Sequence, residues 1–175
     1  MLKSTYIIDF GETCCFKSHL SGSIRIRMIW RGWLFAKIRQ ELEKNMEQVL
    51  RKLTLDFFGK GKHKISPNKF FEMENGFLLD VRSKEEADSI SIAMKSHPNI
   101  ESKNIPVHEI PDRLNEVPND KPVGVFCPAN VRSAIVYAYL LSKGLSDVRI
   151  IDGGYADLTE ALKPGPVLKA LQGKK

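Results

Sequence analysis

A cysteine and an arginine five residues apart, Cys127 and Arg132, are the side chains best suited to covalent chemistry in this sequence. A thiolate is a strong nucleophile, and a nearby guanidinium favours it over the thiol because its positive charge is permanent. Cys127 follows the apolar run Val123–Phe126, which is typical of a buried strand. From Val131 onward, apolar residues recur at helical spacing. The cysteine is therefore expected where a strand ends and a helix begins, a usual place for ligands in open α/β sheets.

The segment between the strand and the helix is expected to hold an anion. The first N–H groups of a helix lack partners within it, and a turn around Cys127 would aim several amides at the sulfur. Asn130 suits the left-handed backbone that such a loop needs, and Ser133 can cap the loop or donate a hydroxyl to the anion. We predict Cys127 and Arg132 as catalytic residues. The predicted substrate-binding residues of the loop are Pro128, Ala129, Asn130, Val131 and Ser133.

The alternative without a catalytic role is that Cys127 is a structural cysteine buried at the end of a core strand, as free cysteines often are. The arginine at the start of the following helix favours a functional thiol.

A second buried strand is predicted at Phe77–Val81, so that Asp80 and Arg82 lie at the same edge of the sheet as Cys127. Two interpretations stay open. Asp80 and Arg82 either bind substrate, or form a local ion pair that fixes the loop.

The rest of the sequence alternates between strand and helix patterns. The predicted elements are a helix over Glu41–Phe58, a turn at 59–62, a strand at Lys64–Ile65, a helix from Ser66 to Met73, a helix with a Ser83–Glu86 capping box reaching about Met94, a strand at Ile105–Val107, a helix over Ile110–Val117, a strand at Val148–Ile151 and, after Gly153–Gly154, a helix over Tyr155–Leu162. This alternation predicts an α/β fold with a parallel sheet of about five strands flanked by helices on both faces.

Positive charge is concentrated in the N-terminal third of the chain. Residues 1–60 hold 11 Lys and Arg against 6 Asp and Glu, a net +5, whereas residues 61–175 hold 16 against 15, a net +1. We therefore predict a domain at 61–175 that does not bind nucleic acid, and a partly helical extension at 1–60. Three cysteines, two of them adjacent, make no disulfide framework, which together with a reactive thiol suggests the cytoplasm.

The extension allows several interpretations. Residues 24–38 carry tryptophans, apolar residues and four basic residues, a pattern compatible with weak contact with an anionic membrane surface. The alternatives are a loosely packed extension, or a natural start at Met46. A metal site at Cys14 and Cys15 has little support, since no second cysteine pair accompanies them.

The loop Cys127–Ser133 resembles the Cys-x-x-Gly-x-Arg-Ser loop of the rhodanese-like family of sulfurtransferases, with Asn130 in place of the glycine. Other family motifs follow the same order along the chain, and the resemblance spans Lys64 to Leu162. They are Leu78–Ser83 with Glu86, which resembles a strand ending in Asp-Val-Arg; Asn104–Val107, which resembles an Asn-Ile-Pro element; and Val148–Tyr155, which resembles the last strand and its Gly-Gly-aromatic turn. The family's Gly-His-Ile-Pro-Gly-Ala segment is missing, and residues 97–102 stand in its region.

This resemblance implies a rhodanese-like fold and a sulfurtransferase that uses neither metal nor organic cofactor. Cys127 would take sulfane sulfur from a small anionic donor such as thiosulfate and pass it to cyanide, a small thiol or a protein cysteine. The alternatives are a non-catalytic binding module of the same fold and, less favoured, a phosphatase or arsenate reductase. Family modules that only bind usually lack the cysteine, and the related phosphatases and arsenate reductases have a loop one residue longer than the six residues from Cys127 to Arg132.

Overall fold

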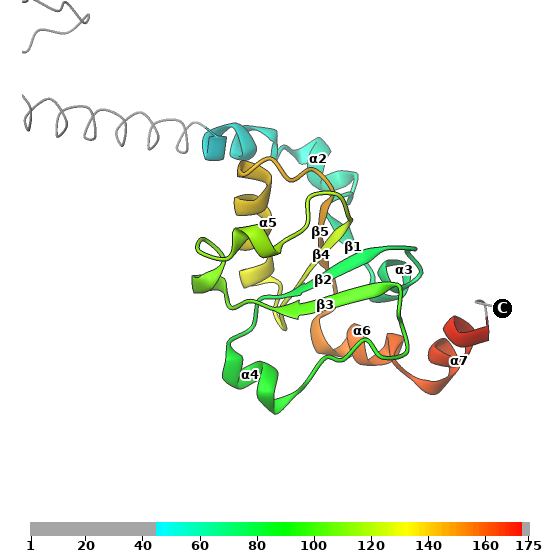
Figure 1. Cartoon of the computed structure of the whole chain (residues 1–175). Helices are drawn as coiled ribbons and strands as arrows, with labels where there is room; N and C mark the ends of the chain where they lie inside the picture. The colour runs from blue at the N-terminus through cyan, green and yellow to red at the C-terminus, as the bar shows by residue number, and fades with distance from the viewer. Residues whose placement is uncertain (1–44, 173–175) are drawn as a thin grey trace, which may run out of the picture. The chain divides into compact units, whose positions relative to one another are not determined.

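The computed structural model describes residues 45–172, which contain one parallel sheet of five strands (Figure 1). The strand order is β1-β5-β4-β2-β3, and each neighbouring pair is parallel. The strands are β1 (Lys64–Ile65), β2 (Gly76–Asp80), β3 (Ile100–Asn104), β4 (Val123–Phe126) and β5 (Val148–Ile151). Parallel strands need crossover connections, and helices supply most of them here.

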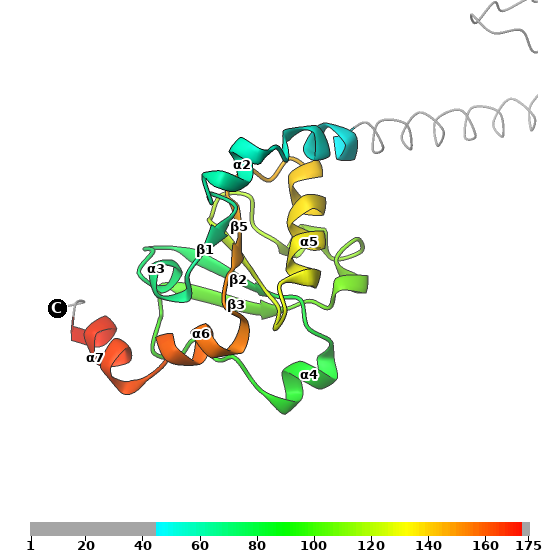
Figure 2. The same ribbon diagram turned by 180° about the vertical axis from the view of Figure 1, so that it is seen from behind.

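Helices cover both faces of the sheet, as Figures 1 and 2 show from opposite sides. One face packs against α5 (Val131–Ser142), and the other packs against α3 (Pro67–Phe71) and α6 (Gly154–Ala161). The other helical segments are α2 (Leu55–Gly59), α4 (Lys84–Ser89), α7 (Pro164–Gln172) and the short 3₁₀ turns η1 (Val107–Glu109) and η2 (Leu114–Glu116). The predicted α/β fold class is therefore confirmed. No helix within residues 45–172 is long and apolar enough to cross a membrane.

Side chains of the central strands alternate between two apolar clusters. Phe77, Leu79 and Val125 lie in the cluster beneath α5, whereas Leu78 and Phe126 lie in the cluster beneath α3 and α6. This is the period of two expected for a strand buried on both faces. The next residue after Phe126 is therefore directed toward α5.

Strand register brings the predicted site residues to one edge of the sheet. Asp80, the last residue of β2, is aligned with Phe126, the last residue of β4. Arg82 and Cys127, which follow these strands, consequently share the carboxyl-terminal edge, as the sequence predicted.

The third strand is displaced from its prediction. The structure places β3 at Ile100–Asn104 instead of Ile105–Val107, and the helix predicted at Ile110–Val117 is replaced by the turns η1 and η2. β3 pairs only with β2 among the described residues, and its middle residues are exposed. An edge strand with exposed polar residues lacks the apolar signature on which the prediction relied.

Helix α4 is shorter than predicted because a tertiary contact ends it. Its capping box forms as expected, but it stops at Ser89 instead of reaching Met94. The Arg82 Nη2 donates to the Ile90 carbonyl at 3.0 Å. In a longer helix that carbonyl would accept from the amide of residue 94.

The helix predicted over 41–58 is interrupted. Residues 45–52 are helical, and α2 begins afresh after Thr54, whose hydroxyl accepts from the Phe57 amide at 3.3 Å. Phe57 packs against the cluster beneath α5. The predicted domain boundary between residues 60 and 61 stays a prediction. Helix α7 was not predicted. The predictions for residues 24–38, Cys14 and Cys15 lie outside the described residues.

Candidate active site

Cys127 stands directly after β4 and before the N-terminus of α5. Its Sγ accepts a hydrogen bond from the Ser133 amide, with a nitrogen–sulfur distance of 3.3 Å. The thiol is 1% exposed and belongs to the apolar cluster beneath α5. Among residues 45–172 one amide, that of Ser133, donates to the sulfur, so the prediction of several amides around it is wrong. Alternation along β4 explains this, because it turns the sulfur toward the core.

The loop between Cys127 and α5 is held from two sides. Asn130 has a φ of 59°, the left-handed conformation predicted for it, and its Nδ2 donates to Asp152 Oδ1 at 2.8 Å. On the other side, a Cβ built on Gly154 would lie 2.1 Å from the Pro128 carbonyl oxygen. These contacts tie the loop to the end of β5 and the start of α6, so its shape depends on the neighbouring strand.

The side chains of the loop differ in how they face solvent. Ala129 and Val131 are exposed, and Val131 is exposed to 65%. The Ser133 Oγ is fully buried and has no hydrogen-bond partner within residues 45–172. A buried hydroxyl without a partner is costly, and this one belongs to the residue whose amide binds the sulfur.

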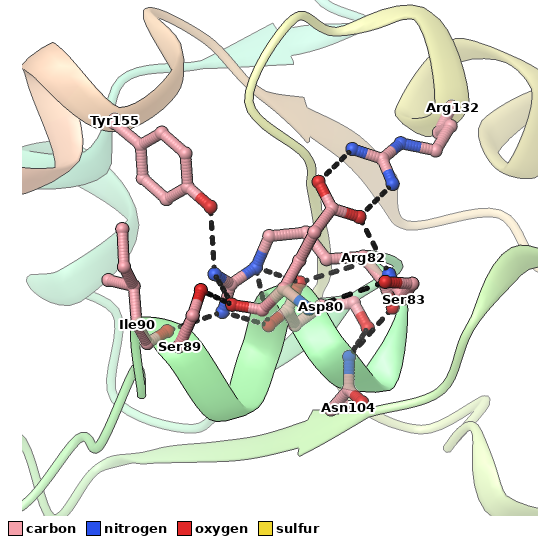
Figure 3. Close-up of polar contacts among 9 residues, drawn as sticks. Asp80, Arg82, Ser83, Ser89, Ile90, Asn104, Arg132 and Tyr155 are labelled. Atoms are coloured by element: carbon pink, nitrogen blue, oxygen red, sulfur yellow. Dashed lines mark hydrogen bonds and ion pairs between the residues drawn. The ribbon is translucent and has the colours of Figure 1, made fainter.

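Arg132 is held by a carboxylate that the sequence analysis did not include in the site (Figure 3). Its Nη1 and Nη2 donate to the two oxygens of Glu86, and the Nη2–Oε1 distance is 2.9 Å. Glu86 and the interaction with Cys127 both raise the pKa of Arg132, while its partial burial acts in the opposite direction. Arg132, in the first turn of the helix that follows the predicted nucleophile, is thus paired with a carboxylate.

Glu86 also caps α4. Its Oε2 accepts from the Ser83 amide at 2.9 Å, while the Ser83 hydroxyl accepts from the Glu86 amide at 3.3 Å. The hydrogen bond from Arg132, followed by that from Ser83, lowers the pKa of Glu86 from 4.5 to about 2. The capping-box spacing identified Glu86 as the end of a helix, but sequence spacing cannot show a contact with a residue 46 positions away.

Asp80 and Arg82 form a buried pair beneath the site, with Arg82 fully buried. Every N–H of the Arg82 guanidinium has an acceptor in the protein. These acceptors are the Asp80 carboxylate, the Glu86 and Ile90 carbonyls and the Tyr155 hydroxyl. The Asn104 Nδ2 adds bonds to the carbonyls of Asp80 and Arg82, each at 3.0 Å. These contacts brace α4 and α6 against the sheet, and they favour the local ion-pair interpretation over substrate binding, because no donor of Arg82 is left for a ligand.

A cavity of about 440 Å³ lies between α4 and β3. Asp80 and Arg82 line it, but Cys127 does not. The cavity therefore opens at the carboxyl-terminal ends of β2 and β3 and does not include the predicted nucleophile.

Comparison with known proteins places this arrangement in a family. Residues 68–161 match the sequence model described as Rhodanese-like domain. A protein named Sulfurtransferase from Allochromatium vinosum is 32% identical over 83 residues, which are 47% of this chain and 71% of the relative. Thiosulfate sulfurtransferase GlpE from Pseudomonas syringae pv. syringae is 33% identical over 82 residues, again 47% of this chain and 71% of the relative.

The crystal structure of a rhodanese-related protein from Thermoplasma volcanium is also similar, at 28% identity and a TM-score of 0.47, covering 58% of this chain and 95% of the other. The family match extends over more than half of the chain and includes β2, the Cys127 loop and β5. This chain therefore belongs to the rhodanese-like domain family.

Proposed function

We propose that this protein is a sulfurtransferase in which Cys127 carries the sulfur. The supporting observation is a cysteine at the carboxyl edge of a parallel sheet whose Sγ accepts from the Ser133 amide, with Arg132 in the first turn of the helix that follows. An amide donor and a guanidinium both stabilise negative charge on sulfur. The names of both curated relatives support sulfur transfer in general.

The reaction has two steps. With thiosulfate as donor, the Cys127 thiolate attacks the outer sulfur, a new sulfur–sulfur bond forms, and sulfite leaves with the electron pair of the broken bond. The resulting persulfide keeps a negative charge on its outer sulfur, next to Arg132. An acceptor thiolate or cyanide then attacks that sulfur, and the Cys127 thiolate leaves. Such covalent catalysis predicts ping-pong kinetics and needs no cofactor.

Mass spectrometry of the protein treated with thiosulfate tests the proposal. The expected result is a gain of one sulfur atom on Cys127 that is removed by cyanide and absent in Cys127→Ala. Failure to form the adduct with any sulfane donor would contradict the proposal.

The second candidate is a non-catalytic module that only binds a partner. The 1% exposure of Cys127 and its place in the core favour this candidate. The same spectrum separates the two, since a binding module gains no sulfur. Hydrolysis of an aryl phosphate would instead indicate the phosphatase alternative, which the six-residue loop disfavours.

A further inference from the structure

The positive charge of Arg132 is offset within the site itself. The two carboxylate oxygens of Glu86 accept hydrogen bonds from Nη1 and Nη2 of the guanidinium. The side chain of Glu86 is 39% exposed, and that of Arg132 is 36% exposed. A bidentate contact of this kind fixes the plane of the guanidinium and places a negative charge directly beside its positive charge.

Glu86 is held in place from its own helix. The Ser83 amide donates to the same Oε2 that accepts from Arg132, so the carboxylate bridges the start of α4 and the start of α5. The depressed pKa of about 2 keeps Glu86 ionised at any pH at which the protein would be assayed. The negative charge beside Arg132 is therefore a permanent part of the site.

Two further cations, Lys64 and Arg82, are paired with carboxylates as well. Lys64 Nζ lies 3.2 Å from Asp152 Oδ1, the oxygen that also binds Asn130, and Arg82 is paired with Asp80. Arg132, Lys64 and Arg82 are thus each paired with a carboxylate, so the charge of each is offset by its partner. A doubly charged donor gains less there than it would at an unpaired arginine.

We propose that Glu86 is a specificity-determining residue that makes the site favour singly charged sulfane donors, such as thiosulfonates and the persulfides of small thiols, over doubly charged thiosulfate. This inference rests on the proposed sulfur transfer. With a thiosulfonate, the Cys127 thiolate forms a bond to the outer sulfur, the donor's sulfur–sulfur bond breaks, and a sulfinate leaves with the electron pair. The chemistry at Cys127 matches that with thiosulfate, and only the charge of the donor differs.

The test compares methanethiosulfonate with thiosulfate, a singly and a doubly charged donor with the same transferable sulfur. We measure kcat/KM for both donors, with cyanide as acceptor, in the wild-type full chain and in Glu86→Gln. Glutamine keeps an acceptor for the Ser83 amide but lacks the charge. Since Coulomb energy is proportional to donor charge, a rise of about tenfold for thiosulfate implies a rise of about threefold for methanethiosulfonate. The ratio of kcat/KM for methanethiosulfonate to kcat/KM for thiosulfate should therefore be about threefold lower in Glu86→Gln than in the wild type.

Two control variants separate charge at the site from other effects. Ser83→Ala removes the hydroxyl cap of α4 but keeps the Glu86 charge, and Glu160→Gln removes one exposed negative charge at the end of α6. Both should keep the wild-type ratio between the donors. An equal loss for both donors in Glu86→Gln, or an unchanged ratio, would overturn the inference and leave sulfur transfer intact. Absence of a Cys127 persulfide with either donor, in wild type and variant alike, would overturn the proposed function as well.

Discussion

Gly154 and the Pro128 carbonyl lie so close together that a Cβ on the glycine would stand 2.1 Å from the carbonyl oxygen. Gly154 also has a φ of 57°, so two independent constraints call for glycine at this position. The start of α6 is thereby part of the wall that shapes the Cys127 loop.

Replacing Gly154 by alanine should displace the loop and slow sulfur transfer by about a hundredfold, because small misplacements of reacting groups are costly. The measurement is kcat/KM with thiosulfate and cyanide. Gly144→Ala is the matched control, since Gly144 also has a positive φ, 93°, but nothing within 4 Å of the added carbon. If both variants lose activity equally, the close approach to Pro128 does not shape the loop.

Ser133→Ala should separate catalysis from stability. The Ser133 Oγ has no hydrogen-bond partner among the described residues, so its removal should leave the free energy of unfolding unchanged or raise it by up to about 1 kcal/mol. Persulfide formation should slow if the hydroxyl donates to the sulfur or to the donor anion. Denaturant unfolding and single-turnover sulfur transfer test the two effects.

Ser83→Ala provides the contrast for stability, because its hydroxyl caps α4 and its loss should cost about 1 kcal/mol. A large loss of stability in Ser133→Ala would show that this hydroxyl has a structural partner.

Arg82→Met should destabilise the protein by about 3–5 kcal/mol, since it leaves the Asp80 carboxylate buried without its partner. Lys60→Met removes one partner of the exposed Lys60–Asp56 pair and should change the free energy of unfolding little. Urea unfolding followed by circular dichroism measures both. Wild-type stability in Arg82→Met would contradict the bracing role and reopen a role for Arg82 in binding substrate.

Glu86 should contribute to stability in a pH-dependent way. Its pKa is lowered from 4.5 to about 2 in the folded protein, so its ionised form stabilises the fold. This contribution is fully present above the ordinary pKa and is lost as the pH falls toward the lowered one. The difference in unfolding free energy between wild type and Glu86→Gln should therefore be larger at about pH 7 than at about pH 3. A difference independent of pH would contradict the ion pair with Arg132.

Much of the fold could be predicted because its central strands are apolar and bounded by clear signals. Val123–Phe126 is a continuous apolar run, Val148–Ile151 is apolar except at Arg149, and the capping-box spacing of Ser83 and Glu86 indicates the start of α4. The sequence did not predict β3 at its observed position, because its exposed residues, such as Glu101 and Lys103, resemble those of a loop. The sequence did not predict the end of α4, because that end depends on a hydrogen bond from Arg82 to the Ile90 carbonyl, which no local pattern encodes.

The site was predicted in part. The left-handed backbone of Asn130 follows from the preference of asparagine for that conformation. The number of amides at Cys127 was overestimated, since it depends on how the loop bends relative to the strand. The pairing of Arg132 with Glu86 depends on the approach of α4 to α5, and local spacing cannot reveal it.

Cys127 packs in the same apolar cluster as Leu79 and Val125, so one side chain serves both the core and the proposed chemistry. Oxidation of its sulfur to a sulfinate would place a fixed charge and two oxygens among these apolar groups. Burying an unpaired charge is costly, so the oxidised chain should lose folded-state stability along with its nucleophile. The redox state of the Cys127 sulfur is thereby linked to the free energy of unfolding of the domain.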